Sequence, residues 1–440
     1  MSTPARLTGS DGKQLAAGAL HWRGARLGPD LVAAARRFAF RHGRVIERDG
    51  AAVLTWDVAA QIEFPRGTAE PGAAERAHGL LAAIPGHNDA GMRPGPLALG
   101  ALPFDAAAPG ALVIPGLAVV VAEGGDAAVV AVGRNEHIPP PVESLQLAIT
   151  AADDAENRDG EAPDRFRVDS VRPHEDFLTR VGAARDAIRA GELDKVVLAR
   201  EVAIVANRRF RQHDLLERIR ALHPACAAFA LDGFVGASPE LLVRRRDRVI
   251  ASRPLAGTVA RSGNLDEDAR LAAGLLASPK DRLEHRYVVD AIAATFARHA
   301  DDIVVPSAPE FLALRNVTHL ATPVSATLRA NRPGGHLPNA LALAVELHPT
   351  PAVGGTPRAA ALEYLRRNEK LDRGRFAGPV GWFDVSGDGE WWIGIRSALV
   401  DGRRARLFAG VGIVDGSDPV LELAETQLKF QALLAAFVRP

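Results

Sequence analysis

The chain has 440 residues, and its 53 Lys and Arg balance 53 Asp and Glu, so the formal net charge is zero. Hydrophobic residues make up 47% of it and charged residues 24%, a composition typical of soluble globular proteins. Because binding to nucleic acid or to an anionic membrane needs an excess of basic residues, we expect neither as a partner.

The single cysteine, Cys226, cannot form an intramolecular disulfide. The N-terminus lacks an apolar core followed by a small-residue cleavage site, so we expect a reducing, cytoplasmic location. The longest apolar tract, residues 111–132, is broken by Pro115, Gly116 and a polar turn at 123–126. It therefore predicts a strand hairpin rather than a membrane span.

The first 175 residues are rich in Ala, Gly and Pro, and they predict strands without recognisable chemistry at 51–56, 111–122 and 126–134. A polar stretch at 150–176 has almost no periodic apolar residues and predicts an exposed connection. We place a sequence boundary near residue 175.

Beyond this boundary, apolar periodicity predicts helices at 174–193 and 211–223 and a strand at 195–205. Paired strands are predicted at 234–246 and 248–261. Strands and helices mix without regular βαβ alternation, so the predicted fold class is α+β rather than a doubly wound parallel sheet.

Lysine is rare here, because only five of the 53 basic residues are lysines: Lys13, Lys195, Lys280, Lys370 and Lys429. An arginine keeps its proton in proteins, whereas a buried lysine can lose it and serve as a base. Lys195, in the predicted strand KVVLAR, is therefore a candidate base. The alternative is a lysine at a strand end with its amine in solvent.

Glu240 lies in FVGASPELLVRR, after a Gly/Ser/Pro turn and directly before an apolar run. A carboxylic acid in a partly desolvated pocket at such a position has a raised pKa, as a general acid requires. The alternative is a glutamate that water solvates in the turn.

A predicted helix in SPKDRLEHRYVVDAIAATF begins with Ser278 as its cap and Pro279 in the first turn. This start places Glu284 on the same face as the apolar Val288 and Ile292. A carboxylate on a core-facing stripe needs a partner, either an arginine or a divalent cation.

Near the C-terminus, DPVLELAETQLKF places Glu422, Glu425 and Lys429 along one helical face. They form either a solvated face with ion pairs within the helix or part of a Mg²⁺ site, since that cation prefers oxygen ligands. Glycines at 254–258, 352–355 and 409–413 would let an anion approach the backbone. Arg396 is predicted in mid-strand among apolar residues, so its guanidinium must be paired.

In this order, these segments resemble the chorismate-utilising enzymes, and most closely their isochorismate synthase branch. The resemblance covers residues 176–440, with a fainter echo in GALPFD at 100–105. Ten motifs carry it: KVVLAR, GASPELL, RPLAGT, SPKDRLEHRYVVD, HLATPVSATL, LHPTPAVGGTP, FAGPVGW, IRSALV, AGVGIVDGSDP and ExxETxxKF.

The resemblance implies one structural unit over residues 1–440, an α+β chorismate-binding fold in which two antiparallel sheets pack face to face with helices outside. Residues 1–175 would be its variable N-terminal part and residues 176–440 its catalytic region. The boundary near 175 is then a boundary in sequence and not between domains.

The resemblance also implies residue roles. Lys195 would take a proton from water, and Glu240 would protonate the departing hydroxyl of chorismate. Glu284, Glu422 and Glu425 would bind Mg²⁺ as the cofactor. The implied substrate-binding positions are Gly257, Thr258, Ala352, Phe376, Arg396, Gly410, Gly412 and Lys429.

Branches of the family differ at a few positions. The ammonia-using anthranilate and aminodeoxychorismate synthases usually carry glutamine where this chain has Lys195, so lysine favours water as the nucleophile. Aminodeoxychorismate synthases also tend to have a lysine nucleophile where this chain has Ala256. The resemblance therefore favours an isomerase, an isochorismate synthase.

The main rival is a salicylate synthase, which goes on to eliminate pyruvate from isochorismate. Those relatives usually have a tyrosine and a threonine where this chain has Phe376 and Ala352, and loss of both hydroxyls favours release of isochorismate. A catalytically silent chorismate-binding protein is the alternative from another class, although Lys195, Glu240 and Glu284 are all present.

The resemblance implies chorismate as a small-molecule substrate, no glutaminase subunit and a monomer. Isochorismate feeds menaquinone biosynthesis, siderophore biosynthesis and salicylate formation, and the sequence does not select among them.

Overall fold

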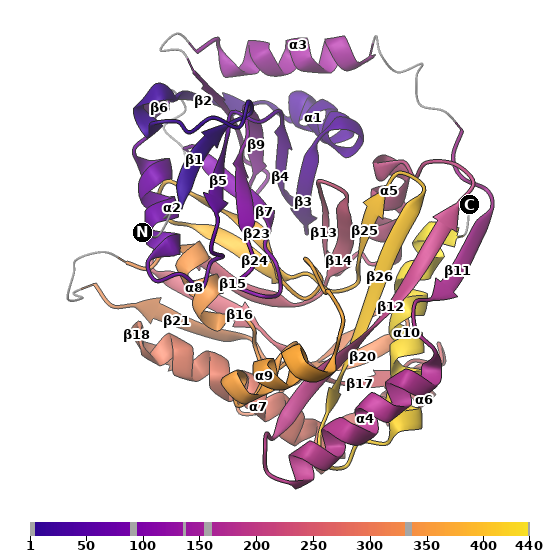
Figure 1. Cartoon of the computed structure of the whole chain (residues 1–440). Helices are drawn as coiled ribbons and strands as arrows, with labels where there is room; N and C mark the ends of the chain where they lie inside the picture. The colour runs from indigo at the N-terminus through magenta and orange to yellow at the C-terminus, as the bar shows by residue number, and fades with distance from the viewer. Residues whose placement is uncertain (1–4, 89–94, 135–137, 154–160, 331–336, 439–440) are drawn as a thin grey trace.

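The computed structural model describes residues 5–88, 95–134, 138–153, 161–330 and 337–438. Most strands belong to two large sheets (Figure 1). Strands from before and after residue 175 hydrogen-bond to each other in both sheets. Part of the predicted connection at 150–176, residues 154–160, lies outside the described residues.

The larger sheet carries one wall of the site described below. Its neighbouring strands are antiparallel, except for the parallel pair β2 and β6. In spatial order it contains β11 (Phe166–Ser170), β12 (Lys195–Ala206), β26 (Arg404–Ile413), β25 (Ser397–Asp401), β14 (Phe234–Ser238), β13 (Ala227–Leu231), β3 (Arg44–Arg48), β4 (Ala51–Trp56), β9 (Leu117–Val121), β10 (Ala127–Gly133), β2 (His21–Leu27) and β6 (Gly86–Asn88), and β22 (Gly355–Thr356) pairs with β12.

The second large sheet is antiparallel throughout its described pairs. In spatial order it contains β1 (Arg6–Gly9), β5 (Ala60–Phe64), β8 (Gly110–Ile114), β7 (Leu97–Ala101), β23 (Pro379–Asp384), β24 (Gly389–Ile393), β15 (Leu241–Arg246), β16 (Val249–Arg253), β21 (Val324–Leu328) and β18 (Ala300–Val304). A small third sheet contains β17 (Leu255–Ala260), β20 (Val317–Ala321) and β19 (Glu310–Ala313).

The two large sheets pack face to face through buried side chains that alternate along their strands. The larger sheet contributes Ile46, Val53 and Phe229, and the other sheet contributes Leu99 and Trp382, all in one core cluster. Alternate residues of a strand point to opposite faces, so this set marks the inner faces of a sandwich. The α+β class and the face-to-face sheets predicted from the sequence are confirmed.

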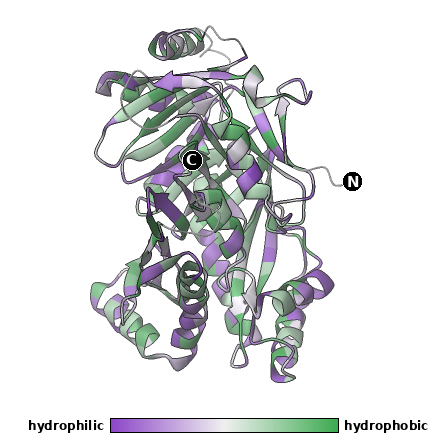
Figure 2. Ribbon diagram, turned by 90° about the vertical axis from the view of Figure 1, so that its left-hand side faces the viewer, coloured by the Kyte–Doolittle hydropathy of each residue, from purple (hydrophilic) through white to green (hydrophobic). Residues whose placement is uncertain are grey.

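Helices cover the outer faces of the sheets, and Figure 2 shows those near the bottom with hydrophilic and hydrophobic residues in alternation. None of the described helices is long and apolar enough to cross a membrane. The described helices are η1 (Ala17–Ala19), α1 (Pro29–His42), α2 (Ala73–Ala82), α3 (Pro141–Asp153), α4 (His174–Arg189), α5 (Gln212–Leu222), α6 (Leu265–Ala277), α7 (Pro279–Ala297), α8 (Ala340–Leu347), α9 (Arg358–Asn368) and α10 (Pro419–Val438).

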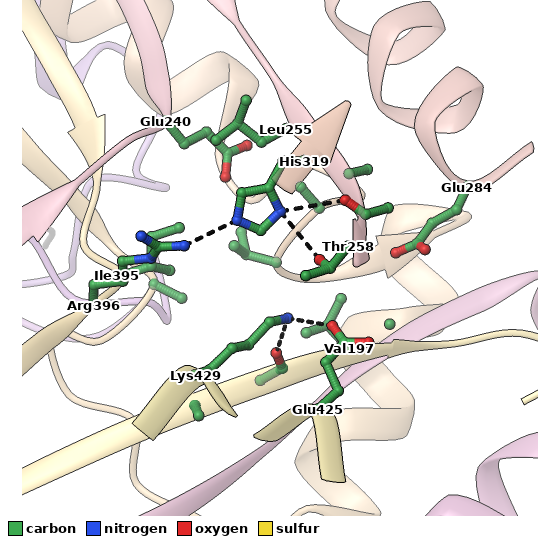
Figure 3. Close-up of a pocket in the computed structure, with 18 of the residues that line it drawn as sticks. Val197, Glu240, Leu255, Thr258, Glu284, His319, Ile395, Arg396, Glu425 and Lys429 are labelled. Atoms are coloured by element: carbon green, nitrogen blue, oxygen red, sulfur yellow. Dashed lines mark hydrogen bonds and ion pairs between the residues drawn. The ribbon is translucent and has the colours of Figure 1, made fainter. Parts of the chain in front are cut away.

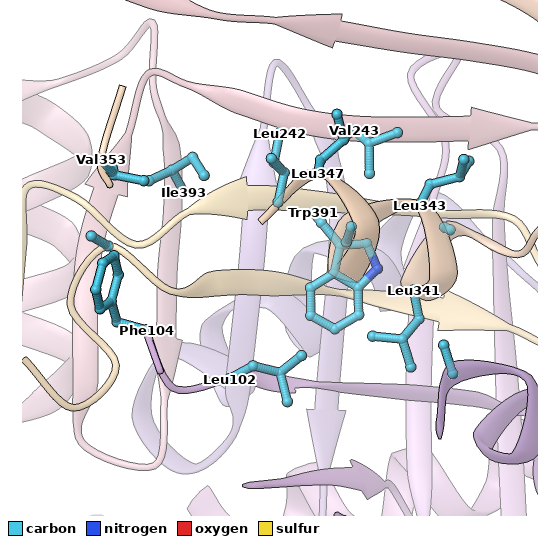
Figure 4. Close-up of a cluster of buried hydrophobic side chains, with 14 of the residues drawn as sticks. Leu102, Phe104, Leu242, Val243, Leu341, Leu343, Leu347, Val353, Trp391 and Ile393 are labelled. Atoms are coloured by element: carbon cyan, nitrogen blue, oxygen red, sulfur yellow. The ribbon is translucent and has the colours of Figure 1, made fainter. Parts of the chain in front are cut away.

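Trp391 of β24 is the largest fully buried side chain of the core between the second sheet and α8. Figure 4 shows its indole beside Leu341 and Leu347 of α8, with Leu242 of β15 nearby. Burial of such a side chain contributes about 3 kcal/mol, which anchors the strands that lead into the site.

The two strands predicted at 234–246 and 248–261 are each divided between sheets. Only β15 and β16 form the predicted antiparallel pair, while β14 joins the larger sheet and β17 the small one. The strands β14 and β16 end at Ser238 and Arg253, which allows the change of sheet, and each end is followed by a proline, which lacks a hydrogen-bond donor.

Candidate active site

A cavity of about 1000 Å³, including the part open to solvent, lies between the small sheet with α7 on one side and β12, β26 and α10 on the other. Figure 3 shows Glu240 and Glu284 entering it from one side and Lys429 and Glu425 from the other. The structure brings twelve of the sequence-predicted site residues to its wall: Glu240, Gly257, Thr258, Glu284, Ala352, Phe376, Arg396, Gly410, Gly412, Glu422, Glu425 and Lys429.

Lys195 lies immediately behind this wall. It is the first residue of β12, where it pairs with Thr356 of β22, and its side chain is 0% exposed. Its Nζ lies 2.9 Å from Oε1 of Glu284, and no described residue accepts a well-aligned hydrogen bond from it. The strand-end position that could have left this amine in solvent instead buries it against a carboxylate.

Gly412 of β26 makes the approach of Lys195 to Glu284 possible. A Cβ atom at this position would collide with Oε1 of Glu284 and come within 2.8 Å of Cε of Lys195. The glycine predicted here for contact with an anion therefore also leaves room for a buried ion pair.

Glu240 is buried, with 3% of its surface exposed, in the loop where the chain passes from β14 to β15. Burial raises the pKa of its carboxyl to about 8, against the opposing effects of a hydrogen bond from the Leu255 backbone and the charges of Lys195 and Lys429. At pH 7 most of this carboxyl is therefore protonated and can donate a proton. The alternative of a glutamate solvated in the turn does not fit this burial.

The helix that carries Glu284 begins as predicted. Ser278 caps α7 by accepting a hydrogen bond from the backbone of Asp281, and Pro279 follows in the first turn. Burial raises the pKa of Glu284, but the neighbouring charges of Lys195 and then Lys429 and Lys280 outweigh it, so the net shift is downward.

Glu422 and Glu425 of α10 each form an ion pair with a lysine. Oε1 of Glu422 lies 3.2 Å from Nζ of Lys280, and Oε1 of Glu425 lies 2.7 Å from Nζ of Lys429. Burial, opposed by Lys280 and reinforced by Glu425, raises the pKa of Glu422. Lys429 also donates to the backbone carbonyl of Gly410 at 2.8 Å.

The carboxylates of Glu284, Glu422 and Glu425 all offer oxygen atoms to the same cavity. They also repel one another, because the charge of Glu425 disfavours ionisation of Glu422. Within the described ranges, no three Asp, Glu, His or Cys side chains lie close enough together to hold a metal ion as they stand. The chemistry of these oxygen donors suits Mg²⁺, but in this arrangement each of the three carboxylates contacts a lysine ammonium group instead.

Arg396 is not in mid-strand, which corrects the prediction. It lies between β24 and β25 with φ 49°, a left-handed conformation that interrupts the apolar run. Its Nη2 donates to Nε2 of His319 at 3.0 Å. Burial, followed by the charge of Arg396, holds the pKa of His319 well below its usual value, so the imidazole is neutral.

The neutral imidazole of His319 has a defined tautomer. Because arginine only donates, Nε2 accepts, and the proton is on Nδ1. Nδ1 lies 3.1 Å from Oγ1 of Thr258 and 3.3 Å from the carbonyl of Gly257 (Figure 3). His319 thus connects Arg396 to the small sheet on the other side of the cavity.

Sequence reasoning missed several residues of this cavity. His319, Lys280 and Arg373 all line the cavity, and none of them was among the site residues predicted from the sequence. Arg373 forms a buried ion pair with Glu369 at 2.7 Å and donates to the carbonyl of Val197 on β12. The rarity of lysine could have singled out Lys280, whereas Arg373 stands among many arginines.

The family model of the chorismate binding enzymes matches residues 46–438. The chain belongs to this family. The match confirms the resemblance that the motifs carry.

Among its relatives, the salicylate biosynthesis isochorismate synthase of Pseudomonas aeruginosa is 42% identical over 61% of this chain, and the match spans only 56% of that protein. The isochorismate synthase DhbC of Bacillus subtilis is 35% identical over 78% of this chain and 80% of its own length. Among solved structures, DhbC from Bacillus anthracis superposes with a TM-score of 0.74 at 29% identity, over 92% of this chain and 98% of that chain.

Proposed function

We propose that this chorismate binding enzyme is an isochorismate synthase, which converts chorismate reversibly to isochorismate. The single observation that carries the proposal is the presence of a buried lysine immediately behind the wall of the cavity and of a buried, protonated glutamic acid on that wall. Water addition with loss of a hydroxyl needs a base and an acid at two separate ring positions, and Lys195 and Glu240 supply these two functions. The names of the relatives support the same reaction.

Lys195 takes a proton from the attacking water. The oxygen of that water bonds to C2 of the ring, the double bonds shift, and the bond from C4 to its hydroxyl breaks. Glu240 gives its proton to the departing hydroxyl, which leaves as water. Glu284, 2.9 Å from Lys195, stabilises the ammonium group that forms.

The two carboxylates of chorismate require positive partners. Arg396 and Lys429 supply fixed charges on the cavity wall, and the backbone of Gly410 lies beside Lys429. Glu284, Glu422 and Glu425 would hold Mg²⁺, which when bound would neutralise one carboxylate of the substrate. Phe376 stacks on Phe408 with ring centroids 5.2 Å apart, so this part of the wall offers the pyruvyl group no hydroxyl.

The proposal is tested by incubating the protein with chorismate and Mg²⁺, with and without ammonium, and identifying the products by chromatography and mass spectrometry. We expect an isomer of chorismate, formed as a reversible mixture at a rate that ammonium does not change. Salicylate with pyruvate would instead establish a salicylate synthase. An aminated product would establish an ammonia-using enzyme.

Replacing Glu284 with glutamine should raise the Mg²⁺ concentration needed for half-maximal rate by about tenfold or more, because a ligand charge is lost. The measurement is the initial rate over a Mg²⁺ titration at saturating chorismate. Asp290→Asn, at an exposed position on the same helix, is the matched control. An unchanged titration curve for Glu284→Gln would refute the role of Glu284 as a ligand.

A further inference from the structure

A second, smaller cavity, of about 320 Å³ including the part open to solvent, lies where β11 ends, α4 begins and β12 passes behind them. In Figure 1 this is the region around α4, beside α10. Its wall includes Ser170, Arg172, Phe177, Arg180, Arg200 and Glu369, and none of the residues that line it lines the substrate cavity.

Arg200 of β12 is buried at this cavity, with 4% of its surface exposed. Its hydrogen bonds go to neutral groups, Oγ1 of Thr426 at 2.7 Å and Oγ of Ser170 at 3.5 Å. The guanidinium carbon of Arg200 lies 5.5 Å from the ring centroid of Phe177 and 5.7 Å from that of Phe430. Within the described part of the chain, no carboxylate forms an ion pair with it, although a buried charge normally requires one.

Two further guanidinium groups lie at the same cavity and share one carboxylate. Arg180 lies 3.0 Å and Arg172 3.5 Å from Oδ2 of Asp176. Burial, and then the charge of Arg180, lower the pKa of Arg200. Three guanidinium groups therefore lie at this cavity, and two of them share the carboxylate of Asp176.

The other carboxylates of the cavity are already occupied. Glu201 pairs with Arg406 at 2.6 Å, and Glu369 pairs with Arg373 at 2.7 Å. These pairs add no net charge, so the three arginines outnumber by two the carboxylate of Asp176 that pairs with Arg172 and Arg180, while Glu175 in the first turn of α4 is exposed. The amino terminus of the 16-residue helix α4 also opens here, without a side chain as its cap, and adds a positive partial charge.

We propose that this pocket binds a small oxyanion with two negative charges, of the phosphate type, separately from chorismate. Arg200 supplies the buried charge at the base, and Arg180 and Arg172 close on the anion from the side of α4. A guanidinium group matches the oxygens of a phosphate in geometry as well as in charge. The ligand is either free phosphate or the terminal group of a small phosphate ester.

The test is calorimetric titration of the protein with inorganic phosphate in a phosphate-free buffer of low salt, repeated with glycerol phosphate. We expect one saturable site per chain, and the tighter ligand identifies the source of the phosphate group. Arg180→Gln and Arg172→Gln should each weaken binding by about tenfold or more, because each removes a charge-assisted hydrogen bond. If Arg180→Gln does not fold, Arg172→Gln carries the test, since this side chain is 37% exposed.

Two controls separate this site from others. Arg367→Gln removes a surface arginine of α9, 2.6 Å from Glu363, and should leave phosphate affinity unchanged. Arg396→Lys alters the substrate cavity and should also leave it unchanged. The proposal is overturned if no saturable binding occurs up to about 10 mM phosphate, or if Arg396→Lys abolishes binding that Arg172→Gln and Arg180→Gln retain.

Discussion

Replacement of Lys195 by glutamine should lower kcat for isochorismate formation by about 10²–10⁴-fold, because the change removes the general base. The amide cannot take a proton from water at any accessible pH. Arg396 and Lys429 remain in place, so chorismate should still bind. Initial rates and a calorimetric titration with chorismate, both in the presence of Mg²⁺, measure the two effects separately.

Two further variants serve as controls for the Lys195→Gln experiment. Lys195→Arg keeps the positive charge beside Glu284 but cannot release its proton, and it should be as inactive as the glutamine variant. Lys370→Gln changes a lysine at an exposed position and should behave as the unaltered protein. Turnover retained by Lys195→Gln or restored in Lys195→Arg would exclude the role of base, and matching thermal unfolding curves exclude misfolding as the cause of a loss.

Much of the fold could be predicted because local patterns specify it. The apolar periodicity at 174–193 predicts α4, and the cap at Ser278 predicts the start of α7. The pairing of strands over long distances could not be predicted in this way. β12 lies between β11 and β26, which are separated by more than two hundred residues, and no local pattern specifies such a partner.

In the site, too, the sequence predicted the residues that local patterns mark but not their long-range contacts. Lys195 and Glu240 stand out as a lysine in a strand and a carboxylate before an apolar run, but their environment depends on the tertiary structure. The contact of Lys195 with Glu284 needs both the register of β12 with β26 and the open position at Gly412. The left-handed turn at Arg396 falls in a continuous apolar run, so sequence alone predicted a strand there.

The burial of Glu240 has a direct consequence for the dependence of rate on pH. Only the protonated carboxyl can protonate the leaving hydroxyl, and its pKa is raised to about 8. As pH rises above this value the protonated fraction falls tenfold per pH unit, so kcat/KM should decline on the alkaline side with a midpoint near pH 8. Below that midpoint Glu240 stays protonated and imposes no loss. A solvated glutamate would instead lose its proton near pH 4.5, the ordinary pKa of this side chain.

Glu240→Gln should lower kcat/KM by about 10²–10⁴-fold at pH 7 and should remove the alkaline decline that Glu240 causes, since the amide neither donates this proton nor titrates. The measurement is kcat/KM for chorismate from pH 6 to pH 10 at fixed ionic strength and saturating Mg²⁺. Glu267→Gln, at an exposed position on α6, is the matched control and should keep both the rate and the decline. Persistence of the same decline in Glu240→Gln would assign it to another group and would separate the burial of this carboxyl from its proposed chemistry.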